Sequence, residues 1–138
     1  KARVADSRFK MDLKSLGKYS ILPLRIILGL VFIYHGYSKL FGSIGIDGFT
    51  GMLTGLGVPL AMVFAVLVAL IEFVGGISVL VGFKVQYAAF LLGMVMVFAI
   101  LLVKLKMGWA AMEIDLSLLA MSISLLLSGP GSKFVLRR

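Results

Sequence analysis

The sequence predicts an all-α integral membrane protein, a bundle of four transmembrane helices with its N- and C-termini both in the cytoplasm. Of its 138 residues 61% are hydrophobic and 14% charged, and the mean hydropathy is +1.11. This leaves too little polar surface for a soluble globule of this size. Four apolar segments follow one another at a length suited to a hydrocarbon core about 30 Å thick. Short basic segments flank them, as is typical of membrane proteins.

We expect one transmembrane domain over residues 20–131, with helices at about 21–41, 60–82, 85–103 and 113–128. Residues 1–19 form a basic tail, and residues 132–138 form a second basic tail in the cytoplasm. Phe9, Leu13 and Leu16 recur every three to four residues, so the first tail is either solvated or a short amphipathic helix on the membrane surface. Ten lysines and arginines lie on the side of the two tails and three on the other, which favours N-in and C-in.

The first predicted helix carries one polar face notched by glycine. At 100° per residue this face consists of Arg25, Gly29, Phe32, Gly36 and Lys39, with His35 beside Lys39. Its glycines would let a neighbouring helix approach closely. Residues 42–59, which follow, are too rich in glycine for an isolated helix and too apolar for a hydrated loop. We therefore expect an interfacial or re-entrant cap there.

The second predicted helix carries an acid, Glu72, within an otherwise apolar or small-residue run over residues 60–82. An ionised carboxylate near the middle of such a span costs roughly 2.5–3.5 kcal/mol, so it usually faces protein or a wet cavity. The face that contains it is made of small residues, namely Ala65, Ala69, Gly76 and Val79. Glu72 is therefore predicted to point at a neighbouring helix.

The third predicted helix follows a turn so short that it must run antiparallel to the second. Its small or soft face is formed by Ala89, Gly93 and Met96. Residues 104–113 are interfacial, with Trp109 at the level of the lipid headgroups. On the fourth helix one face is lined by Glu113, Ser117, Met121, Ser124 and Ser128, and the Gly129–Gly131 turn ends the helix.

Two polar clusters are predicted from these positions. The inner one is an Arg25–Glu72 pair, with Ser124 or Ser128 as further members. The outer one consists of His35, Lys39, Lys104 and Glu113. Either cluster could be functional, since ionisable residues within a membrane are functional candidates by default, or the pair could simply hold two helices together. His35 could hydrogen-bond a quinone carbonyl or relay a proton, or it could bridge two helices.

Several cofactor and partner classes are excluded. The chain has no cysteine, so it cannot form disulfides or ligate an iron–sulfur cluster, and its one histidine excludes a haem held by two histidines of this chain. Metal ligation by His35 with Glu113 stays a weak alternative, because two ligands at an unknown separation are no motif, and we assign no metal to this chain alone. The basic residues flank helices and do not form a nucleic-acid-binding pattern. Electrons would have to come from a cofactor or another subunit.

The charged positions resemble those of a known family. Arg25-x-x-Leu28-Gly29-x-x-Phe32-x-x-His35-Gly36-x-x-Lys39, then Ile71-Glu72-x-x-Gly75-Gly76 and the Gly129-Pro-Gly131 turn, are similar to the DoxX/DoxD family of four-helix membrane proteins. The resemblance covers residues 21–131. It departs from many members at Lys104, where they carry histidine, and in its basic C-terminal tail.

The resemblance implies a membrane subunit of a thiosulfate:quinone-type oxidoreductase in the plasma membrane of a prokaryote. In that case the quinone ring would bind between the first two helices, with His35 and Glu72 as catalytic residues and Arg25, His35, Lys39 and Glu72 holding the quinone. Its partners would be membrane lipid and other redox subunits or further copies of the chain. The alternatives are a non-catalytic anchor or assembly subunit and, with less support, a small transporter or proton pathway built around Glu72.

Overall fold

A computed structural model describes residues 15–136 of the chain, and within this range it contains helices and no strand. After a short turn of 3₁₀ helix, Gly17–Tyr19, come α2 (Ile21–Leu40), α3 (Gly45–Gly55), α4 (Ala61–Val81), α5 (Val85–Leu102) and α6 (Trp109–Ser128). The predicted amphipathic helix around Phe9 and Leu13 lies outside the described residues. Four helices, α2, α4, α5 and α6, are long and apolar enough to span a membrane. The all-α fold with four candidate spans is confirmed.

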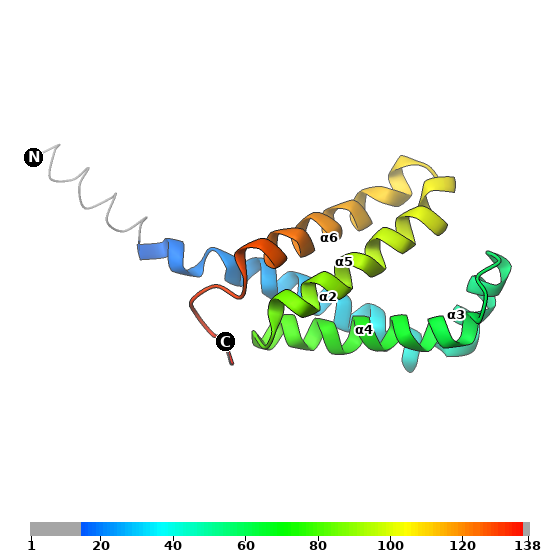
Figure 1. The fold of residues 1–138 in the computed structure, drawn as a ribbon, viewed down its shortest axis with the longest axis horizontal. Coiled ribbons are helices and arrows are strands. Elements are labelled where there is room, and N and C mark those ends of the chain that lie inside the picture. The colour runs from blue at the N-terminus through cyan, green and yellow to red at the C-terminus, as the bar shows by residue number, and fades with distance from the viewer. Residues whose placement is uncertain (1–14, 137–138) are drawn as a thin grey trace, which may run out of the picture.

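The helices form two antiparallel pairs that meet at α4 and α5. Figure 1 shows α2 (cyan) lying along α4 (green), with α5 and α6 forming the second pair. α5 packs on both α4 and α6, and their buried apolar side chains form the main core with Leu28 and Phe32 of α2. The short helix α3 covers the far end of α4, opposite the α4–α5 turn (Figure 1).

The segment that the sequence predicts as an interfacial cap contains the helix α3. Its glycine content makes an isolated helix weak, so packing must stabilise it. Phe49 and Leu53 are buried against Ala61 and Ala65 in the first turns of α4. The cap is therefore an ordered helix that rests on α4.

The glycine-notched contact between α2 and α4 is confirmed. A Cβ atom built on Gly36 would lie 2.4 Å from the backbone nitrogen of Phe73, and one built on Gly76 would lie 2.7 Å from the backbone nitrogen of Ile33. Such contacts are with backbone atoms that cannot rotate away, so only glycine fits. The two helices touch backbone to backbone over this stretch.

The predicted polar face of α6 is not the face that the helix buries. The buried residues of α6 are Leu118, Ser122 and Leu125, whereas Glu113 and Ser128 are exposed. The serines do not need an inward position because their hydroxyls donate to carbonyls one turn earlier in α6, as Ser128 does to Ser124 at 2.6 Å. When serine makes up most of a polar stripe on a membrane helix, that stripe does not indicate which face of the helix is buried.

Candidate functional site: a buried lysine–glutamate pair

The centre of the candidate site is an ion pair between α2 and α4. The Lys39 Nζ atom donates to both carboxylate oxygens of Glu72, 2.6 Å from Oε1 and 2.5 Å from Oε2. The side chain of Glu72 is 2% exposed and that of Lys39 is 16% exposed. The carboxylate is thus removed from solvent, the ammonium is partly exposed, and each is hydrogen-bonded to the other.

The helix α3 closes the pair from the end of the bundle. The Lys39 ammonium lies 4.8 Å from the centre of the Phe49 ring, within the range of a cation–π interaction. Phe49 is itself buried against α4. The ion pair is therefore enclosed by α2, α4 and α3, with an aromatic ring over the cation.

The position of Glu72 follows from the register between α2 and α4. The close approach of Gly36 to Phe73 places Glu72 level with the last turns of α2, where Lys39 is the penultimate helical residue. The lysine side chain extends back along α2 and meets the carboxylate. The small face of α4 is buried as predicted, including Ala65, Ala69 and Glu72.

The predicted Arg25–Glu72 pair is wrong, because Arg25 lies at the other end of the bundle and binds backbone carbonyls. Arg25 is fully buried. Its five N–H groups are matched by five carbonyl oxygens at 2.8–3.1 Å, those of Val79, Leu80, Pro130, Lys133 and Phe134. Neither Ser124 nor Ser128 hydrogen-bonds to Arg25 in the described chain. No donor of Arg25 is left to hold a cofactor in this conformation.

The carbonyl cage around Arg25 joins the end of α4 to the C-terminal segment. Gly82 has φ +79 and ends α4 with Phe83 donating its N–H to Ser78, so the carbonyls of Val79 and Leu80 remain accessible to the guanidinium. A cation beside the C-terminus of a helix is also favoured by the helix dipole. The Gly129–Gly131 turn, expected to end α6, supplies a third carbonyl through Pro130. Sequence reasoning missed this cage, because backbone carbonyls leave no side-chain pattern.

The rest of the predicted outer cluster does not assemble around Lys39. His35 is exposed on α2, and its ring meets that of Tyr34 edge to face at 6.0 Å between centroids. Within residues 15–136, no hydrogen bond or ion pair joins His35, Lys104 or Glu113 to Lys39 or Glu72. Figure 1 shows the α5–α6 connection, which contains Lys104, well apart from α3. Of the outer set, Lys39 alone belongs to the site.

The quinone position between α2 and α4 stays a prediction. At Gly29, Gly36 and Gly76 the two helices are in close contact, so a ring would have to lie outside this stretch. In addition, no group of three or more histidine, cysteine or carboxylate side chains that could hold a metal occurs in the described part of the chain. The site therefore consists of the buried Glu72 carboxylate and the partly buried Lys39 ammonium, and a molecule could reach it only from outside the α2–α4 contact.

The DoxX family model matches residues 20–105, which include α2, α3, α4 and α5 and hence every residue of the ion pair. The chain belongs to the DoxX family. It is 39% identical over 111 residues to a protein of Bacillus subtilis (strain 168) named putative oxidoreductase CatD, covering 78% of each chain. It is 35% identical over 129 residues to the uncharacterized membrane protein Rv3486 of Mycobacterium tuberculosis (strain ATCC 25618 / H37Rv), covering 83% of this chain and 78% of that protein. No solved structure matches the chain.

Proposed function

We propose that this DoxX-family chain is the membrane subunit of a quinone-linked oxidoreductase complex. The observation that carries the proposal is the Lys39–Glu72 pair between apolar helices, in which a buried carboxylate holds a partly buried lysine. Ionisable residues in such positions are costly and commonly serve proton or substrate pathways. The name of the Bacillus relative, a putative oxidoreductase, supports a redox role for the family.

The residues of the pair have distinct roles in this proposal. Quinone reduction takes up two electrons and two protons, and the electrons come from a redox centre of a partner subunit. Lys39, the more exposed member of the pair, would give each of the two protons to a quinone oxygen and would be reprotonated from the aqueous side after each transfer, while the Glu72 carboxylate holds the ammonium in place. His35 lies one turn before Lys39 on the exposed side of α2, where it can hydrogen-bond a ring that arrives through the lipid.

A second candidate, a non-catalytic anchor or assembly subunit, is favoured by a different observation. Arg25 and the Lys39–Glu72 pair have all their charged groups matched within the chain. The sole role of such a pair can be structural, namely to hold α2 against α4. In that case the exposed apolar faces of the bundle would carry the contacts with other subunits.

The experiment that separates the two proposals compares the wild-type complex with a complex that carries one double variant of this chain. The complex is purified from native membranes in mild detergent, its other proteins are identified, and bound quinone is extracted and assayed. Under the redox proposal the double variant Lys39→Met with Glu72→Leu assembles normally and loses quinone reduction. Under the anchor alternative the same variant assembles and keeps its activity, because an apolar pair replaces a structural ion pair.

The cellular setting belongs to the same proposal. Both relatives are bacterial, which supports the plasma membrane of a prokaryote as the location. The excess of lysine and arginine on the side of the two tails supports cytoplasmic termini, and the ion pair then lies in the outer half of the bilayer. Proteolysis of the tails in sealed vesicles of known orientation tests this arrangement.

A further inference from the structure

A groove runs along the seam between α4 and α5 on the outer surface of the bundle. Its volume is about 410 Å³, within the range of about 300–1,000 Å³ found for small-molecule sites. Leu70 and Leu91 form walls at one end, and Gly75 and Ala88 line the groove with little or no side chain. The lining of α4 extends from Leu70 to Ser78, about 12 Å at 1.5 Å per residue, close to the depth of one lipid leaflet.

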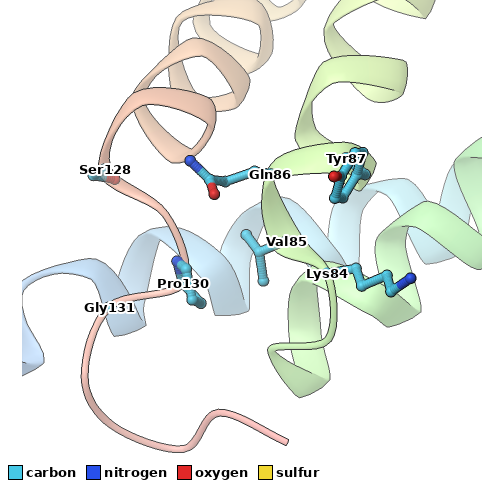
Figure 2. A pocket seen from close by; sticks show the side chains of 7 residues that line it. All are labelled: Lys84, Val85, Gln86, Tyr87, Ser128, Pro130 and Gly131. Carbon is cyan, nitrogen blue, oxygen red and sulfur yellow. The ribbon is translucent and has the colours of Figure 1, made fainter. Parts of the chain in front are cut away.

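The groove ends at the α4–α5 turn, where Lys84 and Tyr87 line it. A second cavity of about 540 Å³ begins at the same two residues and continues to Gln86, Ser128 and the Pro130–Gly131 turn. Figure 2 shows Lys84 and Tyr87 on one side of the first turn of α5 and Gln86 on the other, toward Ser128. An apolar groove and a more polar cavity thus meet at a lysine and a tyrosine.

The conformation and position of Lys84 are unfavourable for the stability of the folded chain by itself. Its φ of +43 is in the left-handed region, which costs a residue with a Cβ atom roughly 1–2 kcal/mol. It immediately precedes α5, whose N-terminal end carries a partial positive charge that disfavours a cation. No carboxylate pairs with Lys84 in residues 15–136, and its nearest aromatic ring, Phe83, lies at 5.9 Å. An anion at this point would offset both the lysine charge and the helix dipole.

We propose that this site binds an anionic phospholipid, with its phosphate at Lys84 and Tyr87 and one acyl chain in the α4–α5 groove. The lysine ammonium and the tyrosine hydroxyl both donate hydrogen bonds to phosphate oxygens. The groove faces the lipid between two membrane-spanning helices, so an acyl chain reaches it without entering the core. The net negative charge of the lipid complements a site with a lysine, a helix N-terminus and no acid. This inference is independent of the quinone proposal.

The test measures lipid retention by the full chain. Delipidated protein in detergent is offered phosphatidylglycerol and phosphatidylcholine with the same acyl chains, and bound lipid is counted by native mass spectrometry. Wild-type protein is expected to retain one phosphatidylglycerol in preference to phosphatidylcholine. Lys84→Asn should reduce this preference about fivefold, the effect of one lysine near an anionic lipid. Asparagine is chosen because it tolerates the left-handed conformation at this position.

A matched control and a groove variant complete the test. Lys133→Asn removes the same charge from an exposed lysine of the C-terminal segment that does not line either cavity, and it should leave the preference unchanged. Ser78→Leu fills the groove and should reduce retention of both lipids, with the protein still folded by circular dichroism.

Three results would overturn the proposal. Equal effects of Lys84→Asn and Lys133→Asn would show general charge attraction. Displacement of the lipid by equimolar glycerol phosphate would show that the groove contributes nothing. Stoichiometric quinone extracted from the wild-type protein, and lost in Ser78→Leu, would assign the groove to another ligand.

Discussion

Breaking the Lys39–Glu72 pair one residue at a time should reveal how strongly the two side chains depend on each other. In Lys39→Met the carboxylate of Glu72, whose side chain is 2% exposed, loses its partner while it stays shielded from solvent. Removing one partner of a buried ion pair typically costs about 3–5 kcal/mol. We expect the free energy of unfolding to fall by that amount.

The opposite single variant should cost less. In Glu72→Leu the lysine is left without an acceptor, but Lys39 is the penultimate residue of α2 and its side chain is already 16% exposed. It can extend toward the headgroup region, as lysines near the ends of membrane helices do. A loss of about 1–3 kcal/mol, the usual penalty of an unsatisfied polar group, is expected.

The double variant Lys39→Met with Glu72→Leu should then unfold close to wild type, because an apolar pair of similar volume needs no partner. The coupling energy between the two positions, the sum of the two single losses, would be about 4–8 kcal/mol. The assay is unfolding in mixed micelles with increasing dodecyl sulfate, followed by far-ultraviolet circular dichroism. A double variant whose loss equals the sum of the two single losses would refute the reasoning that the two charges compensate each other.

Two further predictions concern the α2–α4 contact and the end of the bundle that contains Arg25. Gly36→Ala should destabilise the protein by about 1–3 kcal/mol in the same unfolding assay, because its Cβ would lie 2.4 Å from the Phe73 backbone. The control Gly51→Ala, whose Cβ would meet nothing within 4 Å, should be neutral or stabilising by up to about 1 kcal/mol. Arg25→Lys keeps the charge but offers three donors to five carbonyls. It should speed limited proteolysis after Lys133, and an unchanged cleavage rate would show that the cage does not hold the C-terminal segment.

The fold could be predicted from the sequence because each of its signals is local. Apolar runs of membrane length indicate the helices, and the 100° spacing of small residues indicates the buried faces of α2 and α4. Gly36 and Gly76 lie in the contact that this spacing predicts. The exception is α6, where serines that bond to their own helix imitate an inward polar face.

The partner of Glu72 could not be predicted, because the residue pattern of each helix does not determine the axial register between two antiparallel helices. A shift along the axis decides whether the carboxylate meets Arg25 or Lys39, and both lie on the same face of α2. The contact of Gly36 with Phe73 decides it in favour of Lys39, and leaves Arg25 near Gly82, ten residues or about 15 Å from Glu72 along α4. Arg25 then finds carbonyls that only the folded ends of α4 and α6 bring together.

The different ways in which the two buried cations are compensated decide where proton chemistry is possible in this bundle. Arg25 keeps its proton under all ordinary conditions, and the neutral carbonyls around it have none to exchange. The Lys39 ammonium and the Glu72 carboxylate, in contrast, are joined by hydrogen bonds along which a proton can move. The proposed proton transfer would use this pair, so a proton-coupled activity that survives the apolar double variant would have to take place elsewhere on the bundle or in a partner subunit.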